Sequence, residues 1–227
     1  LHAEHGGGNN STFTTHVVSS SGTDTYSAIA AAVGSLKGSK HGGANRQVLA
    51  QFSLIKQTVR DWKDDDAVAD CVGRILRREL GDGSGLIYGM GHAVYTLSDP
   101  RTVILRQSAR TLAAQRGMLD ELELMEAVER VTPRVFAEVT GHEKVMCANV
   151  DMYSGLIYQM LDIPPDLFTP LFAVARITGW CAHRMEEVLT GGRLYRPAYK
   201  SLTRHREYIP MAARTYRKNP LPAEKRD

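Results

Sequence analysis

Residues 26–60 read YSAIAAAVGSLKGSKHGGANRQVLAQFSLIKQTVR, and this stretch decides the class of fold. Its first part, Tyr26–Leu36, is rich in alanine and predicts a buried helix that ends before Gly38. Residues 44–60 then place apolar side chains three and four positions apart, which is the spacing of one helix face. These side chains are Val48, Leu49, Phe52, Ile55 and Val59. The stretch therefore predicts two helices joined by a glycine-rich loop that carries His41.

Helix signals continue along the rest of the chain. Further helices are predicted at residues 64–80, 100–116, 119–139, 154–161 and 165–189. Asp99 and Pro100 are typical of a helix start, and Gly81 and Gly117 are typical of helix ends. Pro133 is expected to kink or split the helix in which it lies. Because strand signals are nearly absent, the sequence predicts an all-α fold.

The composition excludes several classes of protein. The chain has 227 residues, of which 43% are apolar and 23% charged, and a formal net charge of +3. This is ordinary for a globular protein and gives no electrostatic case for nucleic-acid binding. No apolar run approaches the roughly 20 residues of a membrane-spanning helix, and no signal peptide opens the chain. The three widely spaced cysteines favour a reducing, cytoplasmic setting.

Gly, His and Asp collect in the loops between the predicted helices. His41 precedes a helix, where the helix dipole favours a neutral imidazole that can donate a hydrogen bond to a carbonyl becoming an enolate. His92 follows flexible glycines in GMGH. Asp151 stands among apolar residues at a helix entry, so desolvation would raise its basicity. Taken singly, each residue also fits a helix cap or a surface loop.

Metal binding is a weaker interpretation of the same residues. His2 and His5 form an HxxH pair, which His16 or His41 could complete as a third ligand. No HExxH or carboxylate pattern completes the set, so we expect no metal ligands. A helical metal-binding domain remains the alternative from a different functional class. His183 and His205 are interpreted as structural or solvent-facing.

The order and spacing of several motifs identify a family resemblance. SLKGSKHGGANRQVL around His41, YGMGHAVYTLSDPR around His92 and ANVDMYSG around Asp151 resemble the three signature segments of citrate synthases. The flanks LHAEHGGGNNST, LFTPLFAVARITGWCAHRMEE and RLYRPAYKS agree with the same family. The resemblance spans nearly the whole chain. It implies an acyltransferase that condenses acetyl-CoA with oxaloacetate to citrate and CoA, with no cofactor.

The resemblance also implies roles for individual residues. The residue matching Asp151 removes a proton from the acyl-CoA methyl group, and the histidine matching His41 hydrogen-bonds the thioester oxygen. The histidine matching His92 polarises the ketone of oxaloacetate. The oxaloacetate-binding residues of the family match His5, Arg101, Arg176 and Arg196. The arginine matching Arg196 reaches across a dimer interface, so the resemblance implies a homodimer with shared sites.

The family fold has two all-α domains, a large one and a smaller one inserted into it. By resemblance, residues 1–41 and 156–227 belong to the large domain and residues 42–155 to the small, CoA-side domain. The chain begins at Leu1 without a methionine, as though cut from a longer protein. Most of the family's amino-terminal helices are then absent, and we expect the isolated chain to have little or no turnover.

Three points stay open at the level of sequence. An arginine that contacts the CoA phosphate in many members is replaced here by Thr96. The first motif looks one residue longer than in many relatives, so either Asn9 or Asn10 takes the matching role. The third is the substrate: 2-methylcitrate synthase, which uses propionyl-CoA, is the nearest alternative, because one methylene discriminates by only about 1–3 kcal/mol. A non-catalytic fragment is a further alternative.

Overall fold

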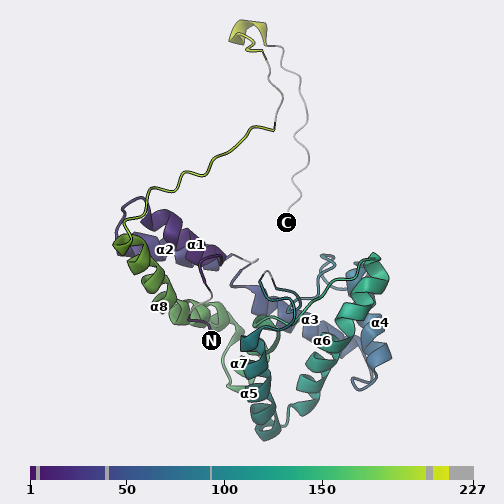
Figure 1. The fold of residues 1–227 in the computed structure, drawn as a ribbon. Coiled ribbons are helices and arrows are strands. Elements are labelled where there is room, and N and C mark those ends of the chain that lie inside the picture. The colour runs from purple at the N-terminus through teal and green to yellow at the C-terminus, as the bar shows by residue number, and fades with distance from the viewer. Residues whose placement is uncertain (4–5, 39–40, 93, 203–206, 215–227) are drawn as a thin grey trace. The chain divides into compact units, whose positions relative to one another are not determined.

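The computed structural model describes residues 1–3, 6–38, 41–92, 94–202 and 207–214 (Figure 1). These residues form eight α-helices and two short 3₁₀ helices, η1 (Pro165–Leu167) and η2 (Met211–Ala213). The α-helices are α1 (Asn10–Ser19), α2 (Thr25–Leu36), α3 (Ala44–Thr58), α4 (Asp65–Leu76), α5 (Pro100–Arg116), α6 (Leu119–Thr140), α7 (Asp151–Met160) and α8 (Phe168–Leu189). Met90 and Ala148 form an isolated antiparallel bridge. The predicted all-α class is confirmed.

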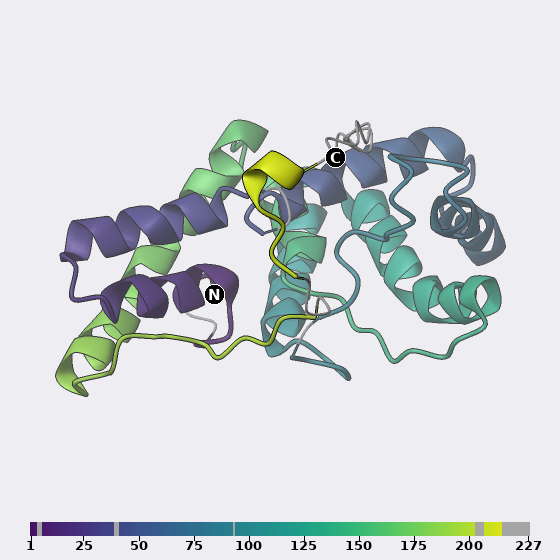
Figure 2. The same cartoon turned by 90° about the horizontal axis from the view of Figure 1, so that it is seen from above.

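The helices up to Tyr195 form two packed groups. Helices α1, α2 and α8 pack together around a small core that contains Ala32, Leu36, Phe172 and Trp180. Helices α3 to α7 enclose a larger core of residues between Val48 and Met160. Figures 1 and 2 show the purple and green helices of the first group beside the blue and teal helices of the second. The predicted domain limits at residues 41 and 155 stay a prediction.

Several helix ends follow the predicted signals. Asp64 caps α4 by accepting the N–H groups of Asp66 and Ala67, and Asp99 caps α5 by accepting the N–H of Arg101. Gly117 ends α5 in the left-handed conformation, with φ 67°. These ends were predictable because a cap depends only on residues within one turn of it.

Other limits differ from the prediction. Helix α4 ends at Leu76 rather than at residue 80, because Arg78 adopts a positive φ of 65° before the predicted stop at Gly81 is reached. Helix α6 runs through Pro133 without being split, since the flanking Val131 and Val135 are buried in the larger core. Helix α1, which was not predicted, has weak amphipathicity and buries mainly Ser and Thr side chains.

Residues 196–227 form a second compact unit, of which 196–202 and 207–214 are described. In this unit Arg214 donates from Nε to the carbonyl oxygen of Ile209 and lies over the ring of Tyr208. In the described part of the chain, no helix has the length and apolar character needed to cross a bilayer.

Candidate active site

Five of the site residues predicted from the sequence lie in the described part of residues 1–195. They lie in loops, at the starts of helices and inside one helix. His41 precedes α3, and His92 lies in the loop between α4 and α5. Arg101 is in the first turn of α5, Asp151 begins α7 and Arg176 is inside α8. The charges of Arg101 and Arg176 both lower the pKa of Asp151, and that of Arg176 also lowers the pKa of His41. Since His92 contacts Arg101 directly, these five residues form one electrostatic cluster.

His92 is held by the backbone of its own loop. Its Nδ1 accepts hydrogen bonds from the backbone N–H groups of Val94 and Tyr95, both at 2.9 Å. An imidazole nitrogen that accepts carries no proton, so the neutral ring is protonated at Nε2. Burial lowers the pKa of His92, the Asp99 carboxylate raises it and Arg101 lowers it further. The ring is therefore a neutral donor through Nε2 at pH 7.

Asp99 and Arg101 form a buried ion pair beside this ring. The Asp99 side chain is 0% exposed and accepts from Arg101 Nε at 3.0 Å and from Nη2 at 2.7 Å. Burial opposes ionisation of Asp99, but the hydrogen bonds from Arg101 outweigh it and the pKa of Asp99 is lowered. Arg101 Nη2 lies 3.3 Å from His92 Nε2. The pair thus fixes a guanidinium next to the donor nitrogen of His92.

Asn149 connects the His92 loop to Asp151. Its side-chain Nδ2 donates to the carbonyl oxygen of Gly91 at 2.9 Å, and its Oδ1 accepts from the N–H of Asp151 at 3.0 Å. Its own N–H donates to the carbonyl of Gly89, whose φ is 87°. A side chain at Gly89 would collide with Met152, so glycine is required there. One asparagine therefore sets the position of two candidate catalytic residues.

Asp151 has the electrostatics of a base. Burial raises its pKa to about 6, against the opposing effect of Arg101 and Arg176, and Asp99 raises it further. Tyr158, about two turns later on α7, has a pKa raised by burial and by the Asp151 charge. A carboxylate with a pKa near 6 is largely ionised at pH 7 yet more basic than an exposed one.

His41 lies against α1 and α8. Its Nε2 is 3.0 Å from Ser11 Oγ, which also accepts from Trp180 Nε1 at 3.2 Å. Burial, and secondarily Arg176, lower the pKa of His41, so the ring is neutral at pH 7. The next residue, Gly42, approaches the carbonyl of Leu36 so closely that any side chain would clash. The Ser11 hydroxyl has one proton, which it can give to Asn9 Oδ1 or to His41 Nε2. When Nε2 accepts it, Nδ1 carries the ring proton and is the nitrogen that can donate to a ligand.

The open choice between Asn9 and Asn10 is answered by their contacts. Asn9 Oδ1 accepts from Ser11 Oγ at 2.9 Å, so Asn9 belongs to the His41 network. Asn10 Oδ1 instead accepts from Ser35 Oγ at 2.5 Å, between α1 and α2. Asn9 is therefore the residue that faces the site.

Arg176 is buried in α8 and contacts the first residues of the chain. Its Nε donates to the carbonyl oxygen of His2, and its guanidinium lies 4.7 Å from the ring centroid of Phe172. The His2 ring packs on Phe172 with centroids 4.2 Å apart. Burial, followed by the positive amino terminus, Arg176 and Arg101, lowers the pKa of His2 to about 4. This neutral histidine was considered in the sequence only as a metal ligand.

Two predicted site residues are not placed in the cluster. His5 lies outside the described residues, and Arg196 is an exposed residue at the start of the second unit. The proposed metal set of His2, His5 and His16 is not assembled in the described part, because His2 contacts Phe172 whereas His16 contacts His183.

The sequence did not predict the functions of Ser11 and Asn149. Asn149 stands in the quoted ANVD motif, but nothing in the sequence linked Ser11 to a histidine 30 residues away.

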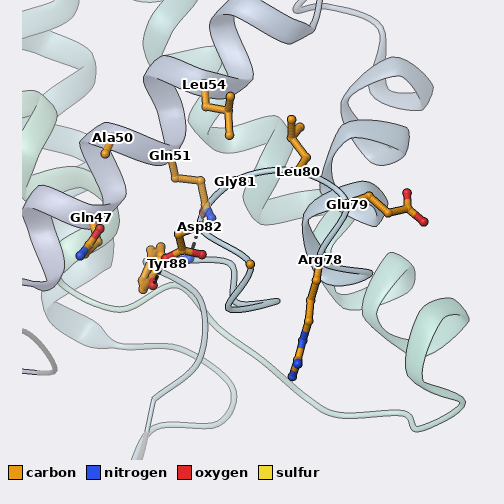
Figure 3. Close-up of a pocket in the computed structure, with 11 residues that line it drawn as sticks. Gln47, Ala50, Gln51, Leu54, Arg78, Glu79, Leu80, Gly81, Asp82 and Tyr88 are labelled. Atoms are coloured by element: carbon orange, nitrogen blue, oxygen red, sulfur yellow. Dashed lines mark hydrogen bonds between the residues drawn. The ribbon is translucent and has the colours of Figure 1, made fainter. Parts of the chain in front are cut away.

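A cavity of about 690 Å³ adjoins the loop that leads to His92. It is lined by α3 and by residues 78–83 and Tyr88 of the loop after α4. Figure 3 shows Leu54 and Leu80 apart from the polar Gln51, Asp82 and Tyr88. Gln51 fixes the loop by accepting from Tyr88 N and donating to Leu86 O, both at 2.9 Å. The cavity can hold part of an elongated ligand, and Arg78 supplies it with a cation.

Together, these groups can remove a proton beside a carbonyl. Asp151 supplies the base, the neutral rings of His41 and His92 can donate hydrogen bonds to oxygens that gain charge, and two guanidinium groups can hold a carboxylate substrate. The geometry thus suits carbon–carbon bond chemistry on an anionic substrate.

Comparisons with known proteins show what this chain is similar to. The family model described as citrate synthase, C-terminal domain, matches residues 1–198. A citrate synthase from Synechocystis is 42% identical over 94% of this chain and 49% of its own length. A 2-methylcitrate synthase from Corynebacterium glutamicum is 38% identical over 95% of this chain and 51% of its own.

A solved structure gives the same result. The citrate synthase of Thermoplasma acidophilum, in a ternary complex with carboxymethyl coenzyme A and oxaloacetate, matches with a TM-score of 0.73 and 30% identity. The match covers 94% of this chain and 52% of that one. The chain thus spans about half the length of the relatives it matches. The matches in sequence and fold show that the chain belongs to the citrate synthase family.

Proposed function

We propose that this chain carries the acid–base groups of an enzyme that condenses acetyl-CoA with oxaloacetate to give citrate and CoA. The observation that supports this most is the position of Asp151. Its pKa is raised to about 6 by burial, in the field of Arg101 and Arg176. A base of that strength beside two neutral imidazoles suits removal of a weakly acidic proton next to a thioester.

The reaction begins with proton transfer from the acyl methyl group to the Asp151 carboxylate. His41 donates a hydrogen bond to the thioester oxygen, which gains charge as the enol forms. The enolate carbon then attacks the ketone carbon of oxaloacetate while His92 Nε2–H donates a hydrogen bond to the ketone oxygen. That oxygen ends with one proton, which balances the proton that Asp151 took up. Water finally cleaves the thioester of citryl-CoA, releasing citrate and the CoA thiol. The residues require no metal or other cofactor for these steps.

Oxaloacetate has two carboxylates, which suit guanidinium groups. Arg101 is fixed by Asp99 and Arg176 by the carbonyl of His2, so both are already oriented before substrate binds. Preorganised guanidinium groups lose little entropy on binding a carboxylate. We include His5 as a further substrate ligand, and Arg196 as one that reaches the site of a second subunit in a homodimer.

Association is supported by apolar side chains on the surface of α8. Val174, Met185, Val188 and Leu189 are all exposed in the described chain. Exposed apolar groups at such density on one helix favour burial against another protein surface. The three cysteines are free thiols, which suits a reducing, cytoplasmic setting.

Thiol release with oxaloacetate and acyl-CoA tests the function directly. Because the chain spans about half the length of its relatives, we propose assaying it alone and fused behind the amino-terminal half of the Synechocystis enzyme. This fusion is called the extended protein below. We expect CoA release by the extended protein and little or none by the chain alone. A folded, dimeric extended protein that binds oxaloacetate but releases no thiol would contradict the proposal.

The relatives also support propionyl-CoA as an alternative to acetyl-CoA. Two of them, from Corynebacterium glutamicum and Shewanella oneidensis, are 2-methylcitrate synthases with 38% and 36% identity. Rates measured in parallel with acetyl-CoA and propionyl-CoA distinguish the two activities. We expect acetyl-CoA to have the higher kcat/KM, and a reversed order would assign the chain to the propionyl-CoA enzymes.

Replacing Ser11 by alanine is expected to lower the kcat of the extended protein up to about tenfold. Ser11 Oγ orients the His41 ring and accepts from Trp180, and one such hydrogen bond is worth about 1 kcal/mol. Ser21, an exposed serine whose Oγ donates to the carbonyl of Val18, supplies the control Ser21→Ala. Equal kcat in the two variants would remove Ser11 from the His41 network.

Replacing Arg78 by alanine is expected to raise the KM for acyl-CoA about tenfold without changing the KM for oxaloacetate. We propose that the Arg78 cavity holds a phosphate-bearing part of CoA, because it adjoins the His92 loop and Thr96 offers no charge. A hydrogen bond to a charged group is worth about 1.5 kcal/mol, or roughly tenfold. The neighbouring Arg77, which is ion-paired with Glu79, supplies the control Arg77→Ala. Equal changes in both variants would argue against this cavity.

A further inference from the structure

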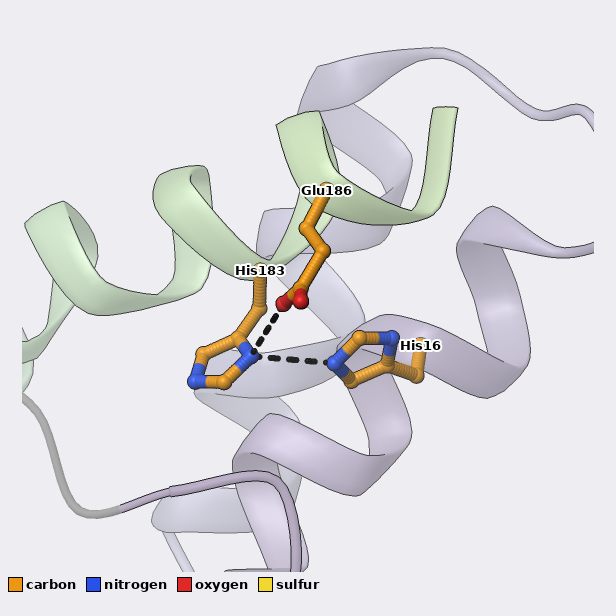
Figure 4. Close-up of side chains that lie close together, drawn as sticks. All are labelled: His16, His183 and Glu186. Atoms are coloured by element: carbon orange, nitrogen blue, oxygen red, sulfur yellow. Dashed lines mark hydrogen bonds and ion pairs between the residues drawn. The ribbon is translucent and has the colours of Figure 1, made fainter. Parts of the chain in front are cut away.

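A second cluster of potential ligands lies between α1 and α8. His16 comes from α1, whereas His183 and Glu186 lie three residues apart on α8. One ligand atom from each residue lies within 4.8 Å of the others (Figure 4). None of the three belongs to the electrostatic cluster around Asp151. The proposed reaction therefore assigns no function to His16, His183 or Glu186.

The two imidazoles already stand at nearly the separation that a bound metal requires. His16 Nε2 lies 3.0 Å from His183 Nδ1. Two nitrogens bound tetrahedrally to zinc at about 2.0–2.1 Å are roughly 3.3 Å apart. Glu186 Oε2 lies 3.7 Å from the same nitrogen of His183. The His16–His183 and His183–Glu186 separations thus differ from that value by only a few tenths of an ångström, and the remaining pair lies within 4.8 Å.

The protonation of His16 is set by a third carboxylate. Glu187 Oε2 lies 2.8 Å from His16 Nδ1 and also accepts from the hydroxyl of Tyr195 at 2.9 Å. Glu187 Oε2 thus accepts two hydrogen bonds, one of them from His16 Nδ1. Nδ1 then carries the proton, and the lone pair of Nε2 points toward His183. Carboxylate–histidine pairs of this kind orient the ligands of metal sites.

The exposed fractions of these side chains also fit a site for a metal ion. The side chains of His16, His183 and Glu187 are 15%, 14% and 7% exposed, whereas that of Glu186 is 66% exposed. The ligand nitrogens are thus sheltered from competing water, whereas the exposed Glu186 can meet an ion that arrives from solvent. Figure 4 shows Glu186 and His183 reaching from the same helix toward His16. Without an ion, the two rings share one hydrogen bond, which His183 Nδ1 donates to His16 Nε2.

We propose that His16, His183 and Glu186 form a binding site for one divalent transition-metal ion of the zinc type. Two imidazoles and one carboxylate are ligands that zinc prefers, with the fourth position left to water. Glu187 is a positioning residue that acts through His16. The ion crosslinks α1 to α8 and so stabilises the small core below them. The site is distinct from the proposed active site and needs no part of it.

The test uses the 227-residue chain, freed of metal with a chelator and then titrated with zinc chloride by calorimetry. We expect one zinc per chain and a rise in the unfolding temperature when zinc is present. Cobalt(II) in the same site should give the visible absorption bands of a tetrahedral ion. His183→Gln and His16→Gln should each weaken binding at least tenfold, and Glu187→Gln should weaken it about 10–100-fold.

Two matched variants locate the ion. His142 is exposed and His41 belongs to the candidate active site, so His142→Gln and His41→Gln should leave zinc affinity unchanged. Circular dichroism confirms that each variant is folded. Absence of stoichiometric zinc binding by the folded chain would overturn the proposal. So would equal affinity in His183→Gln and His142→Gln, or loss of binding in His41→Gln alone. None of these outcomes depends on thiol release.

Discussion

Asp151→Asn is expected to lower the kcat of the extended protein by about 10³-fold, within the range that a general base contributes. Asparagine keeps the size of the side chain but cannot take up a proton. Asp151 N–H would still donate to Asn149 Oδ1, so the start of α7 should keep its position. Steady-state thiol release with saturating substrates measures the effect. Oxaloacetate affinity, measured by calorimetry, should change little.

The control for this substitution is Asp166→Asn. Asp166 is exposed and makes only a surface ion pair with Arg46, so its loss should not alter kcat. If Asp151→Asn retained more than a tenth of the parent rate, another group would have to be the base. If both variants lost activity equally, the effect would be one of folding.

The same residue determines the expected pH dependence. A base must be ionised to act, and the raised pKa of Asp151 is about 6. We therefore expect kcat/KM to fall tenfold per pH unit below about pH 6 and to level off above it. Burial lowers the pKa of both His41 and His92, so protonation of either ring is displaced to lower pH than in an exposed histidine. The acidic limb should accordingly be absent from the residual activity of Asp151→Asn.

His92→Asn is expected to lower kcat by 10²–10³-fold, the usual cost of removing one donor to a developing oxyanion. Asparagine is chosen because its Oδ1 can still accept from Val94 and Tyr95, as His92 Nδ1 does. The loop should thus be preserved while the donor at Nε2 is lost. The rate of citryl-CoA formation, followed by single-turnover kinetics, isolates this step.

His142→Asn is the matched control, since His142 is exposed in the loop after α6. Its kcat should equal that of the parent. In His92→Asn, Asp151 and His41 are intact. The hypothesis therefore predicts that this variant loses less of the rate of proton exchange from acetyl-CoA than of the rate of condensation. Equal losses in exchange and condensation would place His92 in the first step instead.

Part of this structure was determined by short-range sequence signals. The caps at Asp64 and Asp99 and the stop at Gly117 depend on hydrogen bonds within one turn, so the sequence alone located these helix ends. The order of the His41, His92 and Asp151 motifs likewise indicated the family before any coordinates. The end of α4 at Leu76 could not be located in this way, because it depends on the conformation of Arg78.

The sequence by itself determined which residues are candidates for the chemistry, since their types and local motifs are written in order along the chain. Only the tertiary structure decided their chemical state. Asp151 is more basic than an exposed aspartate because it is buried in the electrostatic cluster whose members come from positions 41 to 176. The His41 ring is oriented by Ser11, which lies on another helix. The pairing of His16 with His183 joins residues 167 positions apart. Desolvation and long-range hydrogen bonds exist only once distant helices pack, so no local pattern can specify them.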